Sequence, residues 1–182
     1  MAKGVIIWLT GLSGSGKTRL SLGLTQVLKQ QGIASELIDG DVLRMMNPDL
    51  SFSLEDRNEN VRRASAIALP KAAGGMIVIC AMVSPVRLMR DELRDQSKKK
   101  GVTFMEVYLS APIETCMQRD PKKLYLNARL KNLMNIAGVD LPYEAPINPE
   151  LIIPTHQLTV EESLLLLMEK LNFFQIQKRI IQ

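Results

Sequence analysis

A glycine-rich segment near the start of the chain constrains its fold more than any other feature. Its residues are Gly11, Leu12, Ser13, Gly14, Ser15, Gly16, Lys17 and Thr18. They fit the phosphate-binding pattern of a glycine, four residues and then Gly-Lys-Ser/Thr. Glycines allow a tight turn in which successive backbone N–H groups point at phosphate oxygens. The segment therefore predicts a P-loop, and an ordinary Gly-Ser turn is the alternative.

The surroundings of this loop match those that a P-loop requires. The apolar run Val5–Leu9 predicts a buried strand, and the segment Lys17–Gln31 predicts a helix whose N-terminus carries the positive end of its dipole. Lys17 is expected to reach the β- and γ-phosphates, and the Thr18 hydroxyl is expected to ligate Mg²⁺. The sequence thus predicts binding of ATP with Mg²⁺.

Strand and helix patterns alternate along most of the chain. Further strands are predicted at residues 35–38, 76–81, 102–109 and 151–153, and further helices at 55–73, 86–99, 113–119 and 160–171. The strands are mostly apolar on both faces, which indicates an α/β fold with a parallel sheet covered by helices on both sides. Pro70 predicts a kink or an early end of its helix, and Thr159 with Glu162 predicts a capping box. A length of 182 residues favours one domain, residues 1–182.

Residues 119–150 do not follow this alternation. They are rich in charge, Asn and Pro. A long irregular segment inside a compact domain is usually either disordered or a functional lid. Scattered hydrophobic residues such as Leu124, Tyr125 and Ile136 favour a folded lid. The tail, residues 172–182, is expected either to extend the last helix or to pack on a partner subunit.

Composition excludes several classes of protein. The chain has 23 Lys and Arg against 19 Asp and Glu, a net charge of +4 that suits binding of small anions and is too low for a nucleic-acid coat. Four Phe, three Tyr and one Trp are too few for a base-stacking platform. The chain has no run of 18 apolar residues, the length that a membrane-spanning helix needs, and Val5–Leu9 is too short for a secretory signal. Cys80 and Cys116 are expected to be reduced core residues. We therefore expect a cytoplasmic protein.

Two carboxylates follow the second predicted strand. The strand at 76–81 ends in Ala81-Met82, without the acidic residue that ends a typical Walker B strand, whereas Asp39-Gly40-Asp41 follows the strand at 35–38. One carboxylate there could hold Mg²⁺ through water while the other accepts a proton from an acceptor hydroxyl. The alternative is an ordinary turn with a helix N-cap. Together with the P-loop, the pair predicts a small-molecule kinase.

Arginines gather after these carboxylates. Arg57 and Asn60 lie three apart and share a helical face, and Arg44 precedes them. The guanidinium fork suits phosphate or sulfate oxygens. For Arg62 and Arg63 the alternative is a solvated helix end.

Several segments together carry a resemblance to a known family. They are Gly11–Thr18, Ile38–Arg44, Phe52–Arg63, Val83–Arg87 with Arg90-Asp91, Arg119–Lys122 with Leu124-Tyr125, and Gly138–Pro146. In this order the chain resembles the adenylylsulfate (APS) kinases from about Gly4 to Leu171. The resemblance implies transfer of the ATP γ-phosphoryl group to the 3′-hydroxyl of adenylylsulfate, by a homodimer.

The same resemblance assigns roles to individual residues. Asp41 would be the base, and Asp39 its Mg²⁺- or Lys17-linked neighbour. The acceptor would be held by Arg44, Arg57 and Asn60, with Phe52 stacked on its adenine. Arg119 and Lys122 would belong to a lid over ATP. Family members carry an assigned phosphoserine at the position of Ser84, although a loop serine before a proline is more often structural.

The chain departs from the family pattern in the lid and beside Ser84. Its residues at the altered positions are Val86, Met89, Lys123, Asn127, Lys131, Ile136 and Ala137. Ile136 stands where the family places the aromatic residue that forms the second wall of the adenine site, and replacing a stacking ring forfeits about 1–3 kcal/mol per base. Either adenylylsulfate binds more weakly here, or the acceptor is a different nucleotide-linked 3′-hydroxyl compound. A third hypothesis is a non-catalytic ATP-binding protein.

Overall fold

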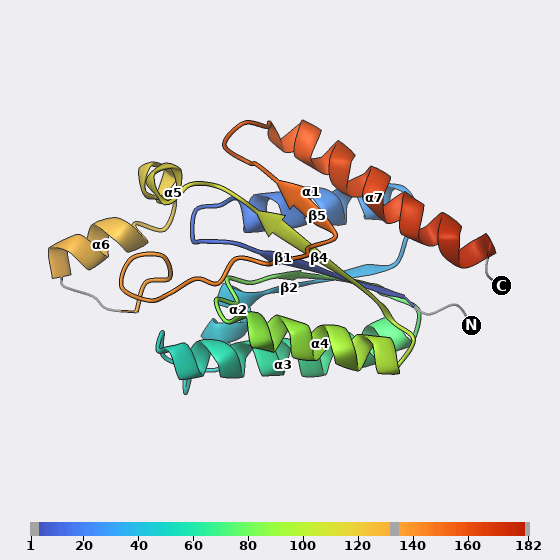
Figure 1. Ribbon diagram of the computed structural model, residues 1–182, viewed down its shortest axis with the longest axis horizontal. Coiled ribbons are helices and arrows are strands. Elements are labelled where there is room, and N and C mark those ends of the chain that lie inside the picture. The colour runs from blue at the N-terminus through green and yellow to red at the C-terminus, as the bar shows by residue number, and fades with distance from the viewer. Residues whose placement is uncertain (1–3, 132–134, 181–182) are drawn as a thin grey trace.

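A parallel sheet of five strands forms the centre of the computed structural model, which describes residues 4–131 and 135–180 (Figure 1). The strands are β1 (Val5–Thr10), β2 (Ser35–Asp39), β3 (Ile77–Ala81), β4 (Thr103–Leu109) and β5 (Leu151–Ile153). Their order across the sheet is β2-β3-β1-β4-β5, and every neighbouring pair is parallel. Each predicted strand is confirmed, with its ends within one residue of the observed ones.

Helices cover both faces of the sheet. Helices α1 (Lys17–Gln30) and α7 (Val160–Ile180) lie on one face, and α3 (Leu54–Ala73) and α4 (Arg87–Lys99) lie on the other (Figure 1). Because both faces are covered, β1 and β3 are buried along their whole length. The predicted fold class is confirmed.

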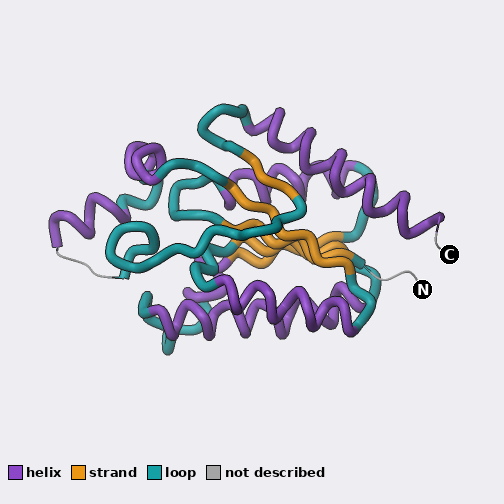
Figure 2. The backbone as a smooth tube through the Cα atoms, viewed as in Figure 1, coloured by secondary structure: helices purple, strands orange, loops and turns teal. Residues whose placement is uncertain are grey.

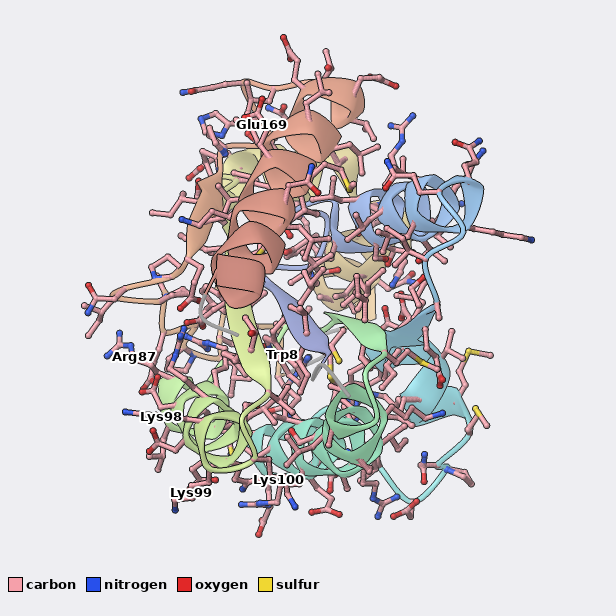
Figure 3. All side chains as sticks on the ribbon, turned by 90° about the vertical axis from the view of Figure 1, so that its right-hand side faces the viewer. Trp8, Arg87, Lys98, Lys99, Lys100 and Glu169 are labelled. Atoms are coloured by element: carbon pink, nitrogen blue, oxygen red, sulfur yellow. The ribbon has the colours of Figure 1, made fainter. Side chains whose placement is uncertain are left out.

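The alternation of side chains along β1 divides the core into two layers. Val5, Ile7 and Leu9 pack with α1 and α7, whereas Ile6 and Trp8 pack with α3 and α4. Figure 3 shows Trp8 inside the molecule and the side chains of Arg87 and of the lysines at 98–100 at its outside. The indole N–H of Trp8 is thus buried on the α4 side of the sheet.

Two short helices were not predicted from the sequence. Helix α2 (Gly40–Met45) directly follows β2, and α6 (Leu124–Lys131) lies within the segment 119–150. Helix α5 (Ile113–Arg119) has the predicted bounds. Helices this short show too few turns of apolar periodicity to be recognised from the sequence.

Two long helices end at positions that the sequence left open, α3 near Pro70 and α7 in the C-terminal tail. Helix α3 continues past Pro70 to Ala73, so the predicted early end is wrong; Pro70 lies in the last turn, and its carbonyl still accepts the Gly74 N–H at 3.0 Å. Helix α7 extends to Ile180, beyond the predicted end at Leu171. The capping box is confirmed, because the Thr159 N–H donates to Glu162 and the Glu162 N–H donates to Thr159 Oγ1.

No helix of the described ranges 4–131 and 135–180 is both long and apolar enough to cross a membrane.

The described part of the segment 119–150 folds across the carboxyl end of the sheet (Figure 1). After α6, residues 135–141 form a tight turn closed by the bridge between Ala137 and Leu141. Residues 142–150, here called the return segment, then run as an irregular chain back to β5 (Figure 2). Tyr125 and Ile136 pack with Ala111 and Cys116 in a small buried cluster. The described part of the segment therefore packs against the rest of the protein through this cluster.

Candidate active site

The loop between β1 and α1 depends on glycines in left-handed conformations. Gly14 has φ 79° and Gly16 has φ 100°. A Cβ on Gly14 would lie 2.7 Å from the Cys116 carbonyl oxygen, so no larger residue fits. Gly16 is the N-cap of α1, and no side chain caps the first-turn N–H groups of that helix. Uncapped N–H groups and the helix dipole make this N-terminus a site for phosphate.

Lys17 points back into the loop. Its Nζ donates to the carbonyl oxygens of Gly11 at 2.9 Å and Leu12 at 2.7 Å. Burial lowers the pKa of Lys17 to about 8, and the nearby Asp41 carboxylate only partly opposes this shift. A phosphate oxygen is a stronger acceptor for an ammonium group than a neutral carbonyl is. Lys17 is thus placed to exchange its loop contacts for phosphate contacts.

Thr18 and Asp39 form an oxygen-lined corner beside the loop. Thr18 Oγ1 donates to Asp39 Oδ2 at 3.0 Å, and Asp39 Oδ1 accepts from the Asp41 N–H at 2.8 Å. Asp39 is therefore the N-cap of α2, so the N-cap alternative is confirmed, and the same side chain also contacts Thr18 of the P-loop. A hydroxyl and a carboxylate oxygen suit Mg²⁺, which takes few protein ligands and keeps several waters. Within residues 4–131 and 135–180, no group of three or more His, Cys, Asp or Glu residues could hold a metal ion.

Asp41, in the first turn of α2, faces the segment 119–150. Its carboxylate forms an ion pair with the ammonium group of Lys122. Both side chains are about half exposed, so solvent and ligands can reach them. Lys122, predicted to act over ATP, thus contacts the predicted base directly.

Two guanidinium groups approach the ring of Phe52. The Arg44 and Arg57 guanidinium carbons lie 4.8 Å and 5.4 Å from its centroid. Burial and the charge of Arg44 lower the pKa of Arg57 to about 10. Arg57 also donates to the Asn135 carbonyl at 2.8 Å, which ties α3 to the turn that carries Ile136. A cationic pocket with one exposed aromatic ring results.

Asn60 completes this pocket. Its Nδ2 donates to the Gly40 carbonyl at 2.9 Å, and its buried Oδ1 has no hydrogen-bond partner within the described chain. A buried acceptor without a partner is costly unless a ligand or water satisfies it. Asn60 lines the cleft, so its Oδ1 could accept a hydrogen bond from a ligand there.

Ser84 is buried in a polar network. Its Oγ accepts from Trp8 Nε1 at 3.0 Å and donates to Thr10 Oγ1 at 3.1 Å, and the side chain is 3% exposed. Ser84 also has φ 39°, a conformation uncommon for a residue other than glycine. These contacts favour the structural alternative for Ser84 over a phosphoserine.

Arg119 begins the segment 119–150, and Ile136 lies near its middle. Arg119 donates to the Thr155 carbonyl at 2.6 Å and to the Gly14 carbonyl at 3.4 Å, so it lies over the P-loop. Ile136 is 3% exposed, and its N–H donates to the Asp140 carboxylate at 2.6 Å. It packs on Tyr125 and still contributes to the cleft wall.

One cleft of about 1200 Å³ brings most of the predicted residues together. It is lined by Ser13, Gly14, Gly16, Lys17, Thr18, Asp41, Arg44, Phe52, Arg57, Asn60, Ser84, Arg119, Lys122 and Ile136. Gly11, Leu12, Ser15 and Asp39 are not part of its wall. Gly11 and Leu12 contact the cleft residue Lys17 through their carbonyl oxygens, and Asp39 contacts the cleft residue Thr18.

The loop after β5 also lines the cleft and was not predicted. Thr155 Oγ1 donates to the Ser15 carbonyl at 2.8 Å, and Leu158 forms part of the wall beyond it. These residue types carry no distinctive chemistry. The signal was topological, because the carboxyl ends of parallel strands meet at one edge of the sheet, where α/β proteins bind their ligands.

Comparison with known proteins decides the family. The family model described as adenylylsulphate kinase matches residues 3–154. The chain belongs to the adenylylsulfate kinase family. An adenylyl-sulfate kinase from Saccharomyces bayanus is 43% identical over 92% of this chain and 84% of its own length.

Solved structures agree with this membership. An APS kinase structure from Mycobacterium tuberculosis, in complex with AMPPNP and APS, has a TM-score of 0.88 and 36% identity, and covers 94% of this chain and 99% of its own. A hexameric APS kinase from Thiobacillus denitrificans has a TM-score of 0.70 and 29% identity, over 94% of this chain and 29% of its own. The likeness to the adenylylsulfate kinase family thus covers both the P-loop and the acceptor half of the cleft.

Proposed function

We propose that the chain transfers the γ-phosphoryl group of ATP to the 3′-hydroxyl of adenylylsulfate. The observation that carries the proposal is that a single cleft is lined both by the P-loop residues Lys17 and Thr18 and by the acceptor pocket around Phe52. The adenylyl-sulfate kinase names of relatives and the APS-bound M. tuberculosis structure support it.

In this mechanism the P-loop residues hold ATP. The N–H groups at the start of α1 and the Lys17 ammonium bind the phosphates. Thr18 and Asp39 would hold Mg²⁺, which when bound neutralises charge on the β- and γ-phosphates. Arg119, lying over the P-loop, closes the ATP side.

Asp41 then serves as the general base. The 3′-oxygen of the acceptor attacks the γ-phosphorus, its proton passes to the Asp41 carboxylate, and the bond from the γ-phosphorus to the ADP oxygen breaks. For this step Asp41 exchanges Lys122 for the acceptor hydroxyl. The freed Lys122 ammonium then faces the transferring phosphoryl group.

The acceptor occupies the pocket around Phe52. Arg44 and Arg57 bind the charged sulfate and phosphate oxygens, whereas the Phe52 ring stacks on the base. The buried Asn60 Oδ1 accepts a hydrogen bond from the acceptor.

A steady-state assay tests the proposed function. Purified protein with ATP and Mg²⁺ receives adenylylsulfate, AMP or adenosine, and 3′-phosphorylated product is measured. Turnover of adenylylsulfate that disappears in Lys17→Ala supports the proposal. No turnover of adenylylsulfate, with ATP still bound, would contradict the proposal.

A second candidate keeps the chemistry and changes the acceptor. The aliphatic wall at Ile136 favours it, because the ring that the family uses there is missing. If adenylylsulfate is the substrate, Ile136→Phe should lower its KM about fivefold through added stacking. If the pocket is shaped for another acceptor, the larger ring should overpack it and raise the KM.

The wider organisation is also proposed. We infer one kinase domain, residues 1–182, with residues 119–150 as its lid. Assembly as a homodimer follows from the family resemblance, and the description of the T. denitrificans relative as hexameric supports self-association in general. Cys80 and Cys116, both buried free thiols, fit the reducing cytoplasm.

A further inference from the structure

Arg90 lies outside the cleft wall and is among the most deeply buried side chains of the described chain. It belongs to α4, and its exposed fraction is 0%. Its three nitrogens donate to three different parts of the chain: Nε to Glu106 Oε1 at 2.6 Å, Nη1 to the Ser84 carbonyl at 2.5 Å, and Nη2 to the Glu144 carbonyl at 2.6 Å. A planar guanidinium group can satisfy three such directions, and an ammonium group on a flexible stem cannot reproduce them.

The charge of Arg90 is balanced on β4. Glu106 is also buried, and its second carboxylate oxygen accepts from Arg94 Nη2 at 3.1 Å. Arg94, one turn further along α4, forms an ion pair with Glu150 at the end of the return segment. Arg94 therefore joins α4 to the same segment as Arg90 does, without contacting Ser84.

The first backbone group that Arg90 holds belongs to the wall of the cleft. Val83 and Ser84 line the cleft, and Ser84 has the unfavourable φ of 39°. Such conformations are unfavourable and persist only where surrounding contacts enforce them. Arg90 enforces this one through the Ser84 carbonyl, while Trp8 and Thr10 hold the Ser84 hydroxyl.

The second backbone group belongs to the return segment. The Glu144 N–H donates to the Pro85 carbonyl at 2.9 Å, and Tyr143 OH lies 3.0 Å from Thr10 Oγ1, directly before the P-loop. The return segment follows the turn in which the Asp140 carboxylate fixes Ile136 at the cleft wall. Arg90 thus connects the loop at Ser84 to the chain that carries Ile136.

We propose that Arg90 is a positioning residue that sets the width of the acceptor pocket, by fixing the Ser84 loop and the return segment at one separation. The inference rests on the proposed function, since the acceptor is adenylylsulfate. Arg90 contacts no substrate and acts through Ser84 and Glu144. Its loss should therefore raise the KM for adenylylsulfate and leave the KM for ATP unchanged, because the P-loop and α1 are held by other contacts.

The test compares Arg90→Lys with the matched control Arg94→Lys. Both variants keep the charge and weaken a link between α4 and the return segment. Displacing a wall by about 1 Å can cost on the order of 10²-fold, so we expect Arg90→Lys to raise the adenylylsulfate KM by at least about tenfold. Arg94→Lys should lower only the Tm. All KM values are measured well below the lowest Tm, with folding checked by circular dichroism.

Each result decides the inference. A folded Arg90→Lys variant whose KM values for adenylylsulfate and for ATP equal those of Arg94→Lys overturns the inference. A rise of both KM values by the same factor in Arg90→Lys also overturns it. If Arg90→Lys does not fold, the double variant Arg90→Met with Glu106→Gln takes its place, because it removes the contacts of Arg90 with the Ser84 and Glu144 carbonyls without leaving a buried carboxylate uncompensated. An unchanged adenylylsulfate KM in that folded variant also overturns the inference. If the wild-type protein does not phosphorylate adenylylsulfate, the proposed function itself is refuted. If the wild type turns over adenylylsulfate and the variants keep its KM values, only the inference about Arg90 is refuted.

Discussion

The ammonium group of Lys122 forms an ion pair with the carboxylate of Asp41, which lies 81 residues earlier in the chain. The contact joins the start of the segment 119–150 to the first turn of α2, and both residues line the cleft. Both side chains are about half exposed, so the ion pair contributes at most about 1 kcal/mol to stability. A contact this weak is readily exchanged for contacts with substrates.

Lys122→Ala should therefore affect catalysis much more than stability. We expect kcat to fall by about tenfold to a hundredfold, because a cation that faces the transferring phosphoryl group is lost. The Tm should change little. Lys123→Ala, at the exposed neighbouring lysine, is the matched control and should keep wild-type kcat. Equal kcat values for the two variants would remove Lys122 from the reaction.

The pKa of Lys17 predicts a pH dependence for ATP capture. With a pKa of about 8 in the folded protein against 10.5 ordinarily, Lys17 loses its charge above about pH 8. The ratio kcat/KM for ATP should fall above that pH, approaching about tenfold per unit. A ratio that stays flat to pH 10 would contradict the role of Lys17.

The same shift predicts how stability changes with pH. Between about pH 8 and 10.5 the unfolded chain binds the Lys17 proton and the folded chain does not, so stability should rise with pH through this window. Below about pH 8 both states are protonated, and the cost of burying the charge is constant. Urea unfolding of wild type and Lys17→Met across this range measures the difference, since the variant lacks this contribution.

Asp41→Asn and Asp39→Asn should separate the two carboxylates. Asparagine keeps the size of Asp41 and removes the proton acceptor, so kcat should fall by about 10²–10⁴ with little change in the KM for ATP. Asp39→Asn should instead raise the Mg²⁺ concentration needed for half-maximal rate. If Asp41→Asn kept its kcat and lost ATP binding, Asp39 would become the candidate base.

Phe52→Ala should act on the acceptor alone. Losing the stacked ring should raise the KM for adenylylsulfate by about fivefold to a hundredfold, the equivalent of about 1–3 kcal/mol. Phe52→Tyr keeps the ring and should stay near the wild-type KM. An unchanged KM in Phe52→Ala would mean that the base lies elsewhere in the cleft.

Local patterns in the sequence predicted much of the candidate active site. The P-loop was recognisable because its glycines and Lys17 serve one function within a few consecutive residues. Asp39 and Asp41 could be placed beside it because the carboxyl ends of parallel strands share one edge of the sheet. Thr155 was missed because a threonine after a strand carries no chemistry of its own, and its contacts with the Ser15 carbonyl and with Arg119 are visible only in the structure.

The sequence by itself determined the strands, the long helices and the phosphate-binding loop, because each depends on neighbouring residues and on apolar periodicity that repeats within one element. Only the tertiary structure decided which distant side chains meet. Arg90 reaches Glu144 across 54 residues and Lys122 reaches Asp41 across 81. Such contacts depend on how the crossovers and the return segment stack over the sheet, and no local pattern encodes the direction in which a buried guanidinium or a lid lysine will point.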